Sequence, residues 1–270
     1  MPINVNQKGS VYFYIDLISS RNKDYNLSDV RDLLELFSKY INKKIGRSLK
    51  TPFTIKDGDA ITGGSDYFDH TLDIYQICLE FYFSKDLKVF KKNRNFNEDI
   101  NFYFGVGFGT IDTDQNLDSD INQINGSSFI NAKEASEKSK EITKRGKLTR
   151  KKDLENFSDY FFNTSPFKFY SISSEKESYS NAINGLFYLC YEELIKNDQQ
   201  LKLFSLMDSS LNLENYKIGK ELGYEANYES AEDRAKISSK ISVLVNKSNY
   251  YLYKKVKRDI ARMKTIITEK

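Results

Sequence analysis

The sequence contains no tryptophan, one histidine and two cysteines among its 270 residues. A single histidine, His70, argues against histidine-rich metal sites and against a Ser–His–Asp hydrolase. The cysteines, Cys78 and Cys190, lie far apart within apolar helical patterns, a spacing that suits neither a disulfide framework nor a zinc site. We therefore expect both to be buried free thiols. Any chemistry must then come from Asp, Glu, Lys, Arg and backbone groups.

Long apolar runs are also lacking. Residues 1–10, MPINVNQKGS, have no apolar core of the kind found in signal peptides. No stretch approaches the ~18 uninterrupted apolar residues that a membrane span needs. We therefore expect a cytoplasmic protein. Its length allows one large domain or two ordinary ones, and it is long enough to bury a core without disulfides or a structural metal.

The formal net charge of +3 is unevenly distributed. Residues 133–152 contain nine Lys or Arg against three Glu, and residues 254–270 contain seven Lys or Arg against two acids. Such local excess suits contact with phosphate backbones. The alternative is a solvated helix face.

The pattern of the first 111 residues predicts an α+β fold. Residues 11–17 alternate apolar and polar side chains, which is typical of a strand, and Ser28 then caps a helix. Short strands at 53–56 and 60–62 flank a turn, Asp69 opens a second helix, and residues 100–111 form another strand. This βαββαβ order is that of a ferredoxin-like palm, in which both helices cover one face of an antiparallel sheet.

The strand order brings two carboxylates together. Strands one and two run in the same direction with strand three between them, so the end of strand one meets the turn Asp57-Gly58-Asp59. Asp16 and Asp59 should therefore converge on one solvent-facing rim, where Mg²⁺ or Mn²⁺ would bind them and a triphosphate. We assign both a metal-binding and catalytic role and count Leu17 among the metal-binding positions. The alternative is that Asp16 only ends a strand and Asp59 only belongs to a turn.

Two further features suit a phosphate ligand. The loop from Leu17 to Arg21 offers backbone N–H groups, and the guanidinium of Arg21 offers a forked donor. Gly105, Gly107 and Gly109 lie on one face of the fourth strand, which suggests close approach by a ligand or another backbone. The alternative for these glycines is a helix packed on a smooth sheet.

Four segments resemble the SatD family, and their order is similar to that of class III nucleotide cyclases. They are Tyr14–Arg21 (YIDLISSR), Phe53–Asp59 (FTIKDGD), Phe104–Ile111 (FGVGFGTI) and Gly126–Ala135 (GSSFINAKEA). The resemblance implies a palm domain over residues 1–175, a nucleoside triphosphate ligand and a homodimer. It adds nucleotide-binding positions, and our full set is Ser19, Ser20, Arg21, Lys56, Gly58, Gly105, Gly107 and Asn131. Asn131 lies one place beyond the cyclase asparagine, no arginine follows it in the matching turn, and Lys56 lies one place nearer its aspartate than the cyclase lysine, which leaves base choice and cyclisation open.

SatD-like proteins also end in a helix-turn-helix, and residues 176–270 agree with that pattern after a possible extra strand at 167–172. Residues 216–223 would form its first helix and residues 235–245 its recognition helix, with Ile237, Ile241 and Leu244 or Val245 facing the core. The side chains left to face DNA are Lys236, Ser239, Lys240 and Ser242, joined by Lys254 and Lys257 on the terminal helix. The alternative is a plain helical bundle for dimerisation.

Three functions follow from these patterns. The first is a metal-dependent nucleotide-binding protein, a nucleotide cyclase or nucleotidyltransferase, coupled to DNA binding. The second is a DNA-binding transcriptional regulator whose palm senses a nucleotide or dimerises without catalysis. The third is a protein-interaction scaffold in which neither site is active.

Overall fold

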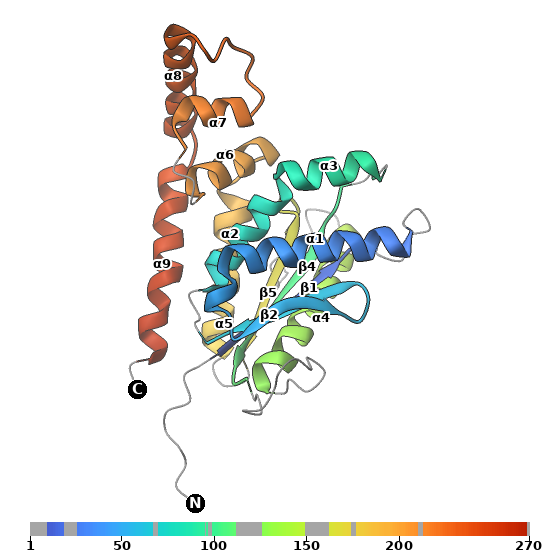
Figure 1. Ribbon diagram of the computed structural model, residues 1–270. Coiled ribbons are helices and arrows are strands. Elements are labelled where there is room, and N and C mark those ends of the chain that lie inside the picture. Colours follow the sequence, from blue (N-terminus) through green and yellow to red (C-terminus); the bar gives the residue numbers. More distant parts are fainter. Residues whose placement is uncertain are drawn as a thin grey trace, which may run out of the picture.

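The computed structural model describes residues 10–18, 26–66, 70–94, 96, 99–111, 126–148, 162–173, 177–209 and 213–268. Its centre is a five-stranded sheet of order β2-β3-β1-β4-β5 (Figure 1). The strands are β1 (Ser10–Leu17), β2 (Thr51–Lys56), β3 (Ala60–Ser65), β4 (Phe102–Gly109) and β5 (Phe167–Ser173). The expected position of the third strand between the first and second is confirmed, as is the extra strand near residue 167.

Helices surround this sheet and continue beyond it. A 3-10 turn (Gly46–Ser48) follows α1, and a π-helical turn (Leu189–Glu193) follows α5. The α-helices are α1 (Leu27–Ile45), α2 (His70–Tyr82), α3 (Lys85–Asn93), α4 (Ser127–Leu148), α5 (Glu177–Tyr188), α6 (Asp198–Asp208), α7 (Asn215–Glu221), α8 (Ala231–Lys247) and α9 (Tyr250–Thr268).

Both faces of the sheet are covered, which corrects the expectation of helices on one face only. Val11, Phe13 and Ile15 of β1 belong to the main core with α1 and α2. Tyr12 and Tyr14 point the other way and form a smaller core with residues of α4. The sheet is also not purely antiparallel, because β4 and β5 pair in parallel. A parallel pair needs a crossover connection, and α4 supplies it across the second face.

The glycines of β4 explain how closely α4 approaches. A Cβ on Gly107 would collide with the carbonyl oxygen of Ser128 and the amide of Ala132, and one on Gly105 would collide with backbone atoms of Ala132 and Ser136. The structure shows that this glycine-rich strand allows a helix to pack closely on the sheet. The space beside Gly105 and Gly107 is filled by backbone, so these two residues are corrected from nucleotide-binding positions to packing positions.

The close packing of α4 on β4 leads to a prediction about stability. We expect Gly107→Ala to lower the free energy of unfolding by about 1–3 kcal/mol, because the backbone of α4 must move away from the sheet. Gly46→Ala is the control, since a Cβ there meets only Asn42 at 3.8 Å. Urea unfolding followed by circular dichroism measures both. Equal destabilisation by the two substitutions would contradict the packing role.

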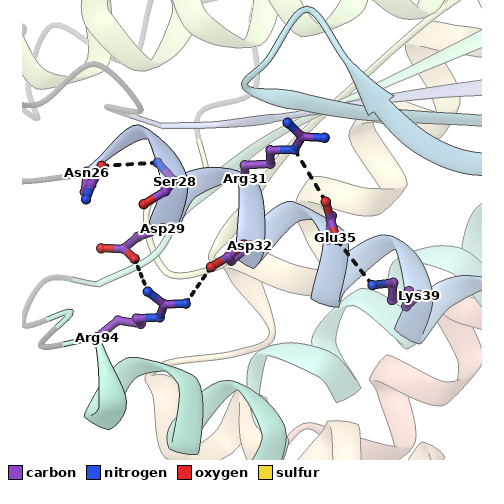
Figure 2. A network of polar contacts seen from close by, with 8 residues as sticks. All are labelled: Asn26, Ser28, Asp29, Arg31, Asp32, Glu35, Lys39 and Arg94. Atoms are coloured by element: carbon purple, nitrogen blue, oxygen red, sulfur yellow. Dashed lines mark hydrogen bonds and ion pairs between the residues drawn. The ribbon is translucent and has the colours of Figure 1, made fainter.

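Helix α1 is fixed by polar contacts at its start (Figure 2). The side chain of Asn26 accepts a hydrogen bond from the Ser28 amide at 3.3 Å, so the cap is Asn26 and not Ser28 as predicted. Arg94, after α3, binds both Asp29 at 2.9 Å and Asp32 at 2.6 Å, which ties the two helices together. The residue expected to open the second helix, Asp69, lies outside the described residues.

The main core continues from the sheet into the C-terminal helices. The ring of Phe187 in α5 stacks on Phe169 of β5 at 3.8 Å between centroids. The carboxylate of Glu192 accepts backbone N–H groups of Asn163, Thr164 and Ser165 at 2.9, 2.8 and 2.7 Å. A cut at residue 175 would uncover this aromatic layer. The boundary between residues 175 and 176 stays a prediction, and we design the experiments below on the full chain.

The last helices lie along one side of the sheet region, with α7 against α8 and α9 running back alongside (Figure 1). Ile237, Ile241 and Val245 of α8 are buried, as the pattern predicted. Both cysteines are buried and free, which confirms that expectation. Within the described part of the chain, no helix combines the length and apolar character needed to cross a bilayer.

Candidate functional site

The two predicted aspartates lie at the same end of the sheet. Asp16 is opposite Ala60 of β3 and opposite Tyr103 of β4. The amide of the next residue, Leu17, donates to the carbonyl oxygen of Asp59 at 3.1 Å. The end of β1 therefore touches the turn between β2 and β3, and the two aspartates are neighbours across it.

The turn that carries Asp59 is held in a particular conformation. Asp57 and Gly58 have positive φ angles of 55° and 86°, which glycine and aspartate tolerate better than most residues. The hydroxyl of Tyr14 donates to Oδ2 of Asp57 at 3.0 Å. Burial, followed by the hydrogen bond to Asp57, raises the pKa of Tyr14, so the phenol stays protonated as a donor. The carboxylate of Asp57 thus anchors the turn that carries Asp59.

A lysine that the pattern did not single out completes the site. Lys140 of α4 places its Nζ 2.5 Å from Oδ2 of Asp16 and 2.7 Å from Oε1 of Glu137. Its Nζ also lies 5.9 Å from the ring centroid of Tyr103. Asp16 is only 5% exposed, which corrects the expectation of a solvent-facing rim at this residue. The basic content of residues 133–152 was visible in the sequence, but the position of α4 over this face was not.

The electrostatics favour a cation beside Asp16. Burial raises the pKa of the Asp16 carboxyl, the Lys140 ammonium lowers it, and the charges of Asp59 and Glu137 raise it again, with a net rise. Burial lowers the pKa of Lys140, but its hydrogen bonds to Asp16 and Glu137 outweigh this and the net pKa is raised. Carboxylates crowded in a partly dehydrated site attract positive charge, and here an ammonium meets that demand.

The donor set fits Mg²⁺ or Mn²⁺ better than zinc. The described residues contain no group of three or more His, Cys, Asp or Glu side chains arranged to hold a metal. Structural zinc usually takes four protein ligands, whereas Mg²⁺ keeps several waters and binds one or two carboxylates together with phosphates. Asp16 and Asp59 provide that smaller set. The ammonium of Lys140 shows that a cation fits against Asp16.

The other residues predicted to bind the nucleotide do not all lie at this site. Lys56 and Gly58 lie at the same end of the sheet, in β2 and in the turn. Asn131 is corrected, because it is buried and its amide donates to the Phe108 carbonyl at 2.8 Å. The buried side chain of Leu17 has no donor atom, so only its backbone carbonyl could serve as a metal ligand. Ser19, Ser20 and Arg21 lie outside the described residues.

Helix α8 exposes the side chains expected to face DNA. Lys236, Ser239, Lys240 and Ser242 are all exposed. Lys236 pairs with Glu232 at 2.7 Å on the same helix. The Nζ of Lys240 lies 6.0 Å from the ring centroid of Tyr224.

The two lysines predicted on α9 have different surroundings. Lys254 is exposed, with its Nζ 5.7 Å from the Tyr250 ring centroid. Lys257 instead pairs with Asp208 of α6 at 2.7 Å, and the side chains are 18% and 8% exposed. The same carboxylate accepts the Tyr250 hydroxyl at 3.0 Å. Lys257 therefore links α9 to α6 in this structure, and its role as a phosphate contact stays a prediction.

Comparison with known proteins gives one structural likeness. No protein-family model and no curated protein matches the sequence. Among the solved structures, the crystal structure of the catalytic core of a rhodopsin-guanylyl cyclase with converted specificity, in complex with ATPαS, is similar at 20% identity and a TM-score of 0.33. The match covers 48% of this chain and 72% of the other. These values assign no activity to this chain, and the resemblance to the SatD family stays a prediction.

Proposed function

We propose that this protein binds a nucleoside triphosphate through a divalent cation, Mg²⁺ or Mn²⁺, held by Asp16 and Asp59. The observation that carries the proposal is the meeting of β1 with the β2–β3 turn, where Leu17 bonds to Asp59 beside the buried Asp16. Two carboxylates at one sheet end, with a cation already against one of them, form a site for positive charge. A triphosphate supplies the oxygens that complete such a site.

Each residue has a role in this proposal. Asp16 and Asp59 would hold the ion, which when bound neutralises the charge of the phosphates. Tyr14 fixes the turn through Asp57, so Asp59 is presented from a preformed loop. Ser19, Ser20 and Arg21 come shortly after Asp16 in the sequence, beyond Leu17 and Ile18, and would donate to the phosphates. Lys140 would release Asp16 to the ion and turn its ammonium toward a phosphate oxygen.

A second candidate, a nucleotide-sensing palm without catalysis, is favoured by two observations. Lys140 already pairs with Asp16, and Asn131 uses its amide on the backbone of β4. Incubating the pure protein with each nucleoside triphosphate and Mn²⁺, followed by mass spectrometry, separates the two. Conversion to a cyclic or transferred nucleotide supports an enzyme. Binding with no turnover supports a sensor, and neither binding nor turnover contradicts both.

We propose further that α8 binds DNA and that the nucleotide site regulates this binding. The exposed set on α8 carries the proposal, because Lys236, Ser239, Lys240 and Ser242 share the surface opposite the buried Ile237 and Ile241. Short polar and cationic side chains on one helix face can reach base edges and phosphates. The expected homodimer also remains a proposal, and sedimentation velocity measures it.

DNA binding makes a salt-dependent prediction. We expect fluorescence anisotropy of the full chain on duplex DNA to show affinity that falls with salt, with a log–log slope of about −0.9 per phosphate neutralised. Lys240→Gln should weaken binding and reduce the magnitude of that slope by about 1. Lys39→Gln is the control, because this exposed lysine of α1, as far as the structure describes the chain, pairs with Glu35 on the same helix and with no distant acid. Absence of binding at low salt, or equal weakening by both variants, would reject this part of the proposal.

A further inference from the structure

A second cavity lies away from the carboxylate site, between α1–α3 and α6–α8. Its volume is about 720 Å³, within the range of pockets that hold small molecules. None of Asp16, Asp59 and Lys140 lines it. Its walls come from the region that packs on the sheet and from the helices that carry the proposed DNA-binding face. A ligand here would touch both parts of the chain.

The walls combine flat rings with cations. Tyr40, Phe83, Tyr216 and Tyr228 line the cavity, as do Leu206 and Leu213. Two cations lie over the Tyr216 ring, with Arg234 Cζ at 5.7 Å and Lys217 Nζ at 5.6 Å from its centroid. Lys220 Nζ lies 5.5 Å from the centroid of Tyr228. Such walls suit a ligand with a planar ring, because rings stack on tyrosine and on guanidinium.

Three of the five basic residues that line the cavity form ion pairs. Lys44 pairs with Glu80 at 3.1 Å, Lys85 with Glu221 at 3.9 Å, and Lys217 with Glu214 at 2.9 Å. These pairs leave Arg234 and Lys220 as the cations that the cavity can offer to a ligand.

Arg234 and Lys220 have no ion pair among the described residues, and both contact Tyr228. Arg234 donates to the Tyr228 carbonyl at 3.4 Å, while Lys220 lies over its ring. Two acids of the lining, Asp86 and Glu229, likewise form no ion pair among the described residues, but both are exposed to solvent whereas Arg234 is half-buried. A charge that is partly dehydrated gains more from a partner than an exposed one. The half-buried Arg234, whose charge also acts on Glu214, is therefore the cation of this cavity that gains most from an anionic ligand beside Tyr216 and Tyr228, and the exposed Lys220 is a second cation at the Tyr228 ring.

We propose that this cavity binds a small aromatic anion, a planar ring that carries a phosphate or a carboxylate. The ring would lie against Tyr216 or Tyr228, and Arg234 and Lys220 would bind the anionic group. Because α7 and α8 supply these residues and α1–α3 supply the opposite wall, occupancy would fix the position of α8 relative to the sheet. The site does not depend on the metal site.

The test uses the full chain in EDTA, with adenosine monophosphate and 4-hydroxybenzoate as probes in isothermal titration calorimetry. At least one probe should bind, and adenosine or inorganic phosphate alone should bind about tenfold more weakly, because each lacks either the charge or the ring. Arg234→Gln and Lys220→Gln should each weaken probe binding by about tenfold. Arg31→Gln is the matched control, since the ion pair that this exposed arginine forms among the described residues is with Glu35 on its own helix.

The outcomes separate this site from the carboxylate site. Binding of the monophosphate alone identifies a nucleotide-type ligand, and binding of the benzoate alone identifies an aromatic acid; both support the cavity. Asp16→Asn should leave this binding unchanged even if metal-dependent binding fails. Loss of probe binding in Asp16→Asn, or retention in both cavity variants, would overturn the proposal. Failure of both probes to bind at millimolar concentration would also overturn it. Because Lys220 is exposed, its variant tests the site without threatening the fold.

Discussion

Replacing Asp16 or Asp59 by asparagine is expected to abolish Mg²⁺-dependent binding of nucleoside triphosphates and to leave the fold intact. Each substitution removes one of the two carboxylates at the end of the sheet while keeping its size. In the wild type, a nucleotide at about 100 times its dissociation constant should add about 2.7 kcal/mol of stability, read as a rise in melting temperature. Neither variant should show that rise.

The control for this experiment is Asp259→Asn, an exposed residue of α9 whose one ion pair within the described part of the chain is with Arg262 on the same helix, at 4.0 Å. It should keep the full nucleotide-dependent rise. Equal rises in the wild type and in both site variants would reject the metal site. An unfolded Asp16 variant is not expected, because burial already penalises the charged form of this carboxyl.

The raised pKa of Asp16 also fixes the sign of two pH effects. Its pKa lies above the ordinary value of 3.8, so the folded chain holds this proton more tightly than the unfolded chain. Ionisation of Asp16 therefore removes stability as the pH rises from about 3.8 through the folded pKa, and Asp16→Asn should flatten that part of the stability profile. Metal-dependent nucleotide binding should do the opposite and weaken as the pH falls through the same range, because the proton competes with the ion.

The convergence of the two aspartates was predictable because it depends on strand order alone. The alternation in residues 11–17 and the Asp57-Gly58-Asp59 turn identify β1 and the β2–β3 hairpin, and a βαββαβ order then places the end of β1 beside that turn. The buried face of α8 could also be predicted from the sequence, because helical periodicity is a local pattern. Ile237 and Ile241 are separated by one turn and are buried together.

What the sequence could not supply was contact between distant elements. The glycines of β4 indicated close approach, but only the structure shows that α4 is the approaching element. Lys257 looked like a free cation on a basic helix, and its partner Asp208 lies 49 residues away. Lys140 is one of nine basic residues in its stretch, and nothing local distinguishes it from its neighbours. In each case the partner is chosen by tertiary packing, which a pattern within one segment does not contain.

Removing the ammonium from the carboxylate site is expected to separate the two proposed functions of the palm. In Lys140→Met, Asp16 loses the cation 2.5 Å away, and the chain without metal should lose about 1–3 kcal/mol of stability. This is less than the cost of breaking a fully buried pair, because the lysine side chain is 25% exposed and water screens part of its charge. Mn²⁺ alone should then raise the melting temperature of the variant more than that of the wild type, because the ion no longer competes with Lys140.

Lys144→Met, an exposed lysine one turn further along α4, is the control and should change neither value. If Lys140 only blocks the site, the variant should also bind nucleotide more tightly in Mn²⁺. If Lys140 moves to a phosphate oxygen in the loaded state, the variant should bind Mn²⁺ more tightly but nucleotide more weakly, since the ammonium is then missing from the complex. Unchanged Mn²⁺ binding in Lys140→Met would mean that the ion does not bind at Asp16. Any metal site would then have to involve Asp59 without Asp16.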